Sequence, residues 1–200
     1  MQQVAVIVDN FYEDPGAIRS LALQANYYMG GQTAYLRSKE CYWDDRLLEV
    51  FSKLLNRRVQ IGAKNTYESG NFKVSNSRYE KSKDIHYDTH TDWNAIVYLN
   101  LPEQCEGGTS MWRHKATGLE GVPSPEDMQR LGFGTEKDFY KKMVLEDGLV
   151  RSNWEEIFRI PMKYNRLVII PSRLFHSRTS DFGVGASDSR LIHTFFLTDA

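Results

Sequence analysis

The sequence has too few cysteines for a disulfide framework or a thiolate metal site, because Cys41 and Cys105 are the only two in 200 residues. We expect both to be buried free thiols. The sequence also lacks an excess of either charge, since 25 basic and 26 acidic residues give a formal net charge of -1. Such a chain has no overall field to attract nucleic acid or an anionic membrane, so we expect neither as a partner.

Long apolar runs and linkers are absent as well. The segment Val4 to Val8 predicts an opening strand, but Asp9 follows it, and it lacks the basic start and the length of a signal peptide or membrane span. No stretch rich in proline, glycine or serine divides the chain. With 41% hydrophobic residues, 200 positions suffice for one core. We therefore expect one soluble, cytoplasmic domain over residues 1–200.

Two helices are expected in the first quarter of the chain, ahead of a region of short strands. Pro15 after Asp14 is a helix start, and Asp45 to Leu55 places apolar residues at helical spacing. Further on, short apolar segments alternate with Gly, Asn and Ser, a pattern typical of a sandwich or jelly roll. The sequence predicts an α+β, mainly β fold with helical support over about 1–58 and a barrel over about 59–200.

A stretch of different character interrupts this barrel between residues 116 and 163. Ser124 before Pro125 is a helix-start signal, and we expect helices over Glu136 to Met143 and over Trp154 to Phe158. An insertion of this length is more often a lid or binding element than an idle loop. We expect it to control the substrate, with packing against the outside of the barrel as the alternative.

The clearest chemical signal is the pair His86-Tyr87-Asp88, followed about ninety residues later by His176. Side chains two residues apart on a strand point to the same face. An imidazole from a distant strand can complete three ligands on one side of a metal, which leaves positions for a bidentate co-substrate and for oxygen. This is the ligand set of a non-haem Fe(II) oxygenase.

The spacing alone is weak evidence, because roughly 0.65 matches to His-x-Asp are expected by chance in this composition. The chain holds a second pair, His90-Thr91-Asp92, shortly before the apolar run Ala95 to Asn100. Asp92 abuts this expected strand, whereas Asp88 leaves room for a turn. We favour His86 and Asp88 as ligands and expect His90 and Asp92 to be loop or supporting polar groups.

Five segments in order resemble the iron(II)- and 2-oxoglutarate-dependent dioxygenases. They are Ile85 to Asp88, Ile96 to Asn100, Glu106 to Thr109, Leu167 to His176 and Arg190 to Phe196. The sequence is most similar to the prolyl-hydroxylase-like branch and to a small uncharacterised bacterial family close to it. The resemblance covers roughly residues 79–197. It implies a double-stranded β-helix, a jelly roll of cupin-like shape with flanking helices. It also implies a hydroxylase that consumes O2 and 2-oxoglutarate and releases succinate and CO2.

The resemblance also implies roles for single residues. His86, Asp88 and His176 would bind Fe(II), and Arg190 would grip the distal carboxylate of the co-substrate 2-oxoglutarate through its planar guanidinium. Arg178 is the alternative cation for that carboxylate.

Two tyrosines and two further histidines need separate assignments. Tyr98 matches a family tyrosine that hydrogen-bonds the same carboxylate. Tyr79 is another candidate pocket residue, with core packing as its commoner role. His193 falls opposite in strand phase to Arg190 and is expected to be structural, as is His114.

The substrate is not fixed by this pattern, because related enzymes act on free amino acids, peptidyl residues, lipids and natural products. We expect hydroxylation of an unactivated C–H bond in a small-molecule, amino-acid or peptidyl substrate. Two other classes stay open. A cupin-type metal enzyme that does not use 2-oxoglutarate would recruit His90 and would not need Arg190, and a non-catalytic barrel could bind a small molecule.

Overall fold

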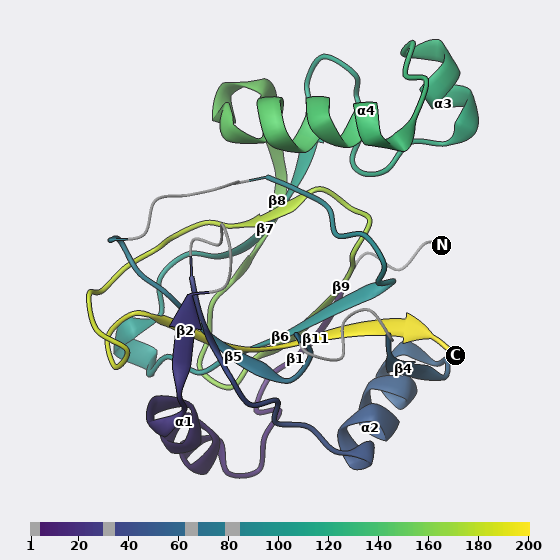
Figure 1. The fold of residues 1–200 in the computed structure, drawn as a ribbon. Coiled ribbons are helices and arrows are strands. Elements are labelled where there is room, and N and C mark those ends of the chain that lie inside the picture. The colour runs from purple at the N-terminus through teal and green to yellow at the C-terminus, as the bar shows by residue number, and fades with distance from the viewer. Residues whose placement is uncertain (1–4, 30–34, 63–67, 79–84) are drawn as a thin grey trace.

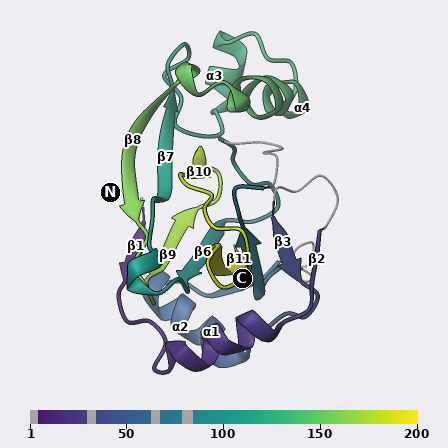
Figure 2. The ribbon, with the colours of Figure 1, turned by 90° about the vertical axis from the view of Figure 1, so that its left-hand side faces the viewer.

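The computed structural model describes residues 5–29, 35–62, 68–78 and 85–200 (Figure 1). Two antiparallel β-sheets dominate this part of the chain, and helices lie at two opposite ends of the molecule (Figures 1 and 2). The architecture is mainly β and jelly-roll-like.

The major sheet has the strand order β1, β9, β6, β11, β5, β3, β2, and β4 also pairs with β11. The bounds are β1 Val6–Val8, β2 Tyr27–Met29, β3 Leu36–Ser38, β4 Val59–Ile61, β5 Asn71–Ser75, β6 Trp93–Tyr98, β9 Leu167–Pro171 and β11 Arg190–Asp199. The last strand, β11, lies in the middle, between β6 and β5. Residues 1–58 contribute three strands to this sheet, so the expectation that they provide helical support was incomplete.

The minor sheet consists of β10 (His176–Arg178), β7 (Gly108–His114) and β8 (Trp154–Pro161), in that order. β8 corrects the expected helix over Trp154 to Phe158. Alternate residues of β8 are more and less exposed, and the strand pairs with β7 along its length. Cross-strand pairing thus overrides the helical preference of the glutamates in this segment. The insertion ends before Trp154 rather than at Lys163.

Two helices, α1 (Pro15–Gln24) and α2 (Asp45–Leu55), begin where the sequence predicts. The carboxylates of Asp14 and Asp44 each accept a hydrogen bond from a backbone N–H of the first turn. Both helices lie under the major sheet (Figure 1). Their apolar residues share a core with the outward face of that sheet, as where Phe51 packs on Phe195 with ring centroids 5.0 Å apart.

The segment between β7 and β8 forms a cap, defined here as residues 115–153, at the other end of the molecule (Figures 1 and 2). It contains α3 (Pro125–Arg130), α4 (Glu136–Tyr140), a π-helix (Lys141–Glu146) and two 3-10 turns (Asp147–Leu149 and Arg151–Asn153), while a third 3-10 turn (Pro102–Gln104) precedes β7. The cap shares a core with the chain around the predicted ligands: Ile85, Tyr87, Trp112, Phe139, Met143, Val144, Trp154 and Phe175. The cap therefore packs on the segments that carry those ligands.

The structure also bears on two expectations, one for the cysteines and one for membrane-spanning segments. Neither Cys41 nor Cys105 forms a disulfide, but Cys41 is exposed, so the expectation that both are buried was wrong. No helix in the described part of the chain is long and apolar enough to cross a membrane.

Candidate metal centre

Several polar residues lie on the face of the major sheet that is turned away from α1 and α2. Register places Tyr98 opposite Ile192 and Asn94 opposite Phe196. Because alternate residues of a strand share a face, Arg190 lies on this inner face too. The apolar members of the face, among them Ile192, share a core cluster with Met111 of the minor sheet.

His86, Asp88 and His176 are brought together beside this face. One donor atom from each lies within 4.8 Å of the others, and no other such group of His, Cys, Asp and Glu occurs among the described residues. Nε2 of His176 is 3.3 Å from Oδ2 of Asp88, and Nε2 of His86 is 3.9 Å from Oδ1 of Asp88. Two imidazoles and one carboxylate in this arrangement match the donor preferences of a non-haem Fe(II) site.

Backbone hydrogen bonds hold the two histidines side by side. His86 and His176 form an isolated antiparallel bridge, in which each backbone N–H donates to the carbonyl of the other, at 3.0 and 2.8 Å. The backbone N–H of Asp88 donates to the carbonyl of Ser172 at 2.9 Å. His86 and Asp88 thus lie in a bridge and a loop rather than in the regular strand that the sequence predicts.

Two further contacts orient the ligand atoms. Nδ1 of His176 lies 2.8 Å from the carbonyl oxygen of Leu174. A carbonyl oxygen can only accept, so Nδ1 carries a proton and donates it, which leaves Nε2 as the ring nitrogen that faces Asp88 and could bind a metal. Nδ2 of Asn94 donates to Oδ2 of Asp88 at 2.6 Å. Such outer contacts commonly fix the ligands of a metal.

One side of the cluster is accessible. The side chain of His176 is 8% exposed, whereas those of His86 and Asp88 are 20% and 25% exposed. The cluster is therefore partly exposed on the side of His86 and Asp88.

Arg190 supplies a buried cation on the inner face. The residue is 2% exposed, and its guanidinium carbon lies 5.5 Å from the centroid of the Tyr98 ring. Its Nε is buried and has no hydrogen-bond partner among the described residues. Burial lowers the pKa of Arg190 from its usual value, and burial raises that of Tyr98. An unpaired buried donor is costly, and a carboxylate of suitable shape would satisfy it.

Arg178, the alternative cation, lies near Arg190, because its charge further lowers the pKa of Arg190. Nε of Arg178 donates to Oδ1 of Asp181 at 2.5 Å, and the Asp181 side chain is only 7% exposed. Nη2 of Arg178 has no partner in the described part of the chain. The carboxylate of Asp181 nevertheless balances the charge of Arg178, which makes Arg190 the better candidate for an external anion.

The other predicted site residues are placed differently. Exposed His90 lies in a loop with φ 66°, and Asp92 accepts a hydrogen bond from the backbone N–H of Asp199 at 3.0 Å. Neither belongs to the cluster. The hydroxyl of Tyr98 is 2.7 Å from Oγ1 of Thr109. Tyr79 lies outside the described residues.

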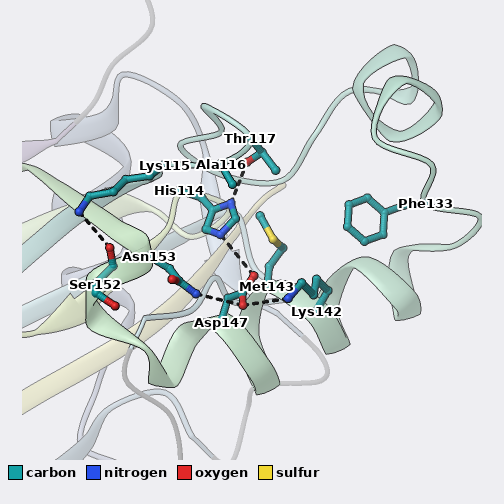
Figure 3. Close-up of a pocket in the computed structure, with 10 residues that line it drawn as sticks. All are labelled: His114, Lys115, Ala116, Thr117, Phe133, Lys142, Met143, Asp147, Ser152 and Asn153. Atoms are coloured by element: carbon teal, nitrogen blue, oxygen red, sulfur yellow. Dashed lines mark hydrogen bonds and ion pairs between the residues drawn. The ribbon is translucent and has the colours of Figure 1, made fainter.

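A pocket of about 600 Å3 opens where the cap meets the end of β7, and its polar groups bind one another (Figure 3). Nε2 of His114 is 3.3 Å from Oδ2 of Asp147, and Lys142 and Asn153 donate to Oδ1 of the same carboxylate at 2.9 and 3.1 Å. Burial lowers the pKa of His114. These contacts tie the cap to β7 and leave His114 in a structural role.

His193 lies on the outward face of β11, as its strand phase predicts. Its Nδ1 is 2.8 Å from the hydroxyl of Tyr12, and its Nε2 is 3.1 Å from the carbonyl oxygen of Gly70. Burial lowers the pKa of His193 to about 4. His193 is therefore a neutral residue of the core and not a candidate metal ligand.

Asn94 was not predicted as a site residue, although its position in the sequence carried a signal. It stands four residues before Tyr98 in a strand with alternating faces, so both share the inner face. Only the structure, however, reveals that Asn94 contacts the metal cluster and that Tyr98 contacts Arg190.

The fold of these sheets is similar to that of solved enzymes named as dependent on 2-oxoglutarate or alpha ketoglutarate, or solved with it bound. HygX from Streptomyces hygroscopicus, solved with nickel and 2-oxoglutarate bound, is 14% identical with a TM-score of 0.53, over 98% of this chain and 83% of that chain. SnoK, a non-heme alpha ketoglutarate dependent carbocyclase of nogalamycin biosynthesis, is 14% identical with a TM-score of 0.59, over 99% and 81%. The epimerase SnoN is 13% identical with a TM-score of 0.52, over 98% and 78%. At these identities the likeness concerns the fold alone.

The sequence assigns the chain to a narrower group. Residues 1–189 match the family of unknown function DUF6445, and the chain belongs to this family. No curated protein matches the sequence. The fold is thus similar to that of these enzymes, and membership of the oxygenase superfamily and of its prolyl-hydroxylase-like branch stays a prediction.

Proposed function

We propose that this protein is an Fe(II)- and 2-oxoglutarate-dependent dioxygenase, built on a double-stranded β-helix, that hydroxylates an unactivated C–H bond. One observation carries the proposal: two imidazoles and a carboxylate from distant segments converge beside the inner face, which also bears a buried arginine with a donor that has no partner among the described residues. The fold likeness adds support, because HygX was solved with nickel and 2-oxoglutarate. Hydroxylation is the default outcome of this chemistry, whereas the names of SnoK and SnoN record ring formation and epimerisation on a similar fold.

The residues present fit the two cofactors. His86, Asp88 and His176 would hold Fe(II), and Arg190 with Tyr98 would hold the distal carboxylate of 2-oxoglutarate. Bound Fe(II) and 2-oxoglutarate would supply O2-dependent oxidation of a C–H bond, with release of succinate and CO2. Asn94 and the Leu174 carbonyl keep Asp88 and His176 in position for this metal.

The substrate class is a proposal as well. A small molecule, an amino acid or a peptide fits a protein with a formal net charge of -1, which offers no overall attraction for nucleic acid or an anionic membrane.

The first experiment tests the metal. The apoprotein should bind about one Fe(II) under anaerobic conditions, and His86→Ala, Asp88→Ala or His176→Ala should abolish binding and succinate formation without unfolding the protein. His90→Ala is the matched control and should bind iron as the wild type does. Iron binding that depends on His90 and not on His86 would contradict the assignment and favour a cupin-type site.

The second experiment tests the co-substrate. Without O2, 2-oxoglutarate should produce the visible charge-transfer absorption of its Fe(II) chelate, and the titration gives its affinity. Arg190→Ala removes a charge-assisted contact worth about 2–4 kcal/mol, so affinity should fall roughly 30- to 1000-fold with Fe(II) binding retained. Arg113→Ala, which breaks surface ion pairs with Glu120 and Glu155, is the control and should have no effect.

The outcomes separate the alternatives. A large loss at Arg178→Ala with none at Arg190→Ala would move the carboxylate role to Arg178. Iron binding without the 2-oxoglutarate absorption would indicate another metal enzyme, and absence of both would indicate a non-catalytic barrel.

A further inference from the structure

Lys73 is a second buried cation on the inner face of the major sheet. It lies in β5, where register places it opposite Ile192 of β11, and it is 7% exposed. Its Nζ lies 4.9 Å from the ring centroid of Tyr35 and 4.6 Å from that of Phe196. No hydrogen bond or ion pair joins this Nζ to another residue in the described ranges. Among the residues that the structure describes, the ammonium is thus held between two aromatic rings without a counter-ion.

Two other buried or partly buried cations, Arg37 and Arg178, are each paired with a carboxylate, whereas Lys73 has no such partner among the described residues. Arg37 is its register partner in β3, and Nη1 of Arg37 is 2.5 Å from Oε1 of Glu68. Arg178 pairs with Asp181. Burial of an ammonium is costly unless it is paired, and contacts with aromatic rings recover only part of that cost.

Lys73 also lies toward the end of the inner face where the metal cluster is. Its Nζ reaches Phe196, which is the register partner of Asn94, and Asn94 donates to Asp88. Arg190 pairs with Ser75, two residues along β5 from Lys73, but its guanidinium lies over the ring of Tyr98, whereas the ammonium of Lys73 lies over that of Phe196. The two cations therefore contact different aromatic rings of the inner face.

The formal charges of the proposed complex also leave the ammonium of Lys73 without an opposite charge. Two positive charges of Fe(II) and one of Arg190 would be balanced by Asp88 and by the two carboxylates of 2-oxoglutarate. The ammonium of Lys73 remains, beside two aromatic rings that could contact an apolar group.

We propose that Lys73 binds a carboxylate of the substrate to be oxidised, and that this substrate is an amino acid or another small carboxylic acid whose apolar part lies against Tyr35 and Phe196. The inference rests on the proposed function in taking the cluster beside it as the reaction centre. Lys73 is then a residue that determines substrate specificity and does not bind the metal or 2-oxoglutarate.

The test uses acids and their amides as probes. The twenty L-amino acids, benzoate and phenylacetate, each beside its carboxamide, are added to anaerobic protein loaded with Fe(II) and 2-oxoglutarate, and binding is measured by equilibrium dialysis. At least one acid should bind, and its amide should bind much more weakly. Lys73→Met should weaken that acid by about 10- to 150-fold, the value of one charge-assisted hydrogen bond, and Lys73→Arg should restore most of the affinity. Lys53→Met, which removes an exposed lysine of α2, is the charge-matched control.

Each result has a definite meaning. The 2-oxoglutarate absorption should be unchanged in Lys73→Met, and the best acid should increase succinate formation in the wild type more than in this variant. Equal binding of acid and amide, equal binding by wild type and Lys73→Met, or binding of no acid at all would overturn the proposal. If the wild type lacks the absorption band, the proposed function fails, and the same dialysis on the apoprotein still decides whether Lys73 binds carboxylates.

Discussion

His176 and His193 are both buried histidines of β-strands, and their surroundings give them opposite chemistry. His176 donates from Nδ1 to a carbonyl and presents Nε2 to Asp88, whereas both nitrogens of His193 are occupied by Tyr12 and Gly70. His193 follows Arg190 by three residues in β11, so the two side chains lie on opposite faces, and this spacing predicted a structural role for His193. The family resemblance grouped His176 with Asp88, but the hydrogen bond from Asn94 to that carboxylate could not be predicted, because only the fold brings these segments together.

The buried His193 predicts a pH-dependent stability. Its pKa is lowered from 6.5 to about 4, so between these values the unfolded chain binds a proton that the folded chain does not. Stability should therefore fall as the pH drops from about 6.5 to about 4, by up to about 3 kcal/mol from this group. Urea unfolding of the apoprotein at pH 7.5 and pH 4.5 measures the loss, and His193→Gln should lack this part of it. Identical pH dependence in both proteins would contradict the assignment.

Lys73 illustrates what a single sequence conceals at this scale. In β5, Asn71, Lys73 and Ser75 alternate with Phe72 and Val74, so the pattern separates two faces. All five residues are buried, however, and a lysine in such a strand gives no sign of whether it meets a carboxylate. Only the position of Phe196 and the absence of a counter-ion in the described part of the chain identify it as a binding residue.

At the scale of elements, local signals placed the helices well and the strands less well. Side-chain caps fix the starts of α1 and α2, and these are visible in the sequence. The short strands β2 and β3 exist only through pairing with each other and with β5, so a local pattern could not reveal them. The same cause explains β8, whose register with β7 determines its conformation.

The cap gives a prediction at this scale. Phe139 of α4 is 1% exposed and packs near Tyr87 and Phe175, the neighbours of Asp88 and His176 in sequence. Phe139→Ala should cost about 3–5 kcal/mol in unfolding free energy and should also weaken Fe(II) binding, because the cavity lies behind the ligand segments. Leu145→Ala, at a residue 52% exposed, is the control and should change neither. Lost stability with unchanged iron affinity would show that the cap packs independently of the ligands.

This packing also changes what the insertion is expected to do. A lid could be removed without harm to the metal site, and the sequence alone allowed that interpretation. A Cβ on Gly148 of the cap would lie 2.4 Å from the carbonyl oxygen of Ile85, next to His86. Deletion of residues 122–153 should therefore disturb the ligand segments as well as any contact with substrate.

For the whole molecule, the proposed ligands should link the two sheets thermodynamically. His176 belongs to the minor sheet and Arg190 to the major sheet, so Fe(II) with 2-oxoglutarate would contact both. At free 2-oxoglutarate about 100-fold above its dissociation constant, the iron-loaded protein should gain about 2.7 kcal/mol in unfolding free energy. Anaerobic chemical unfolding measures this gain. Arg190→Ala at the same concentration should show little of it, and a full gain in that variant would place the co-substrate elsewhere.

The central place of β11 has a consequence for biosynthesis. This strand pairs with β4, β5 and β6, yet it is the last described strand to be made. A ribosome adds roughly 5–20 residues per second, so the earlier strands wait several seconds with an unfilled gap between β5 and β6. During translation the nascent chain therefore exposes two strand edges that can pair with other chains, and cellular yield should depend on chaperones that shield them until residues 190–199 emerge.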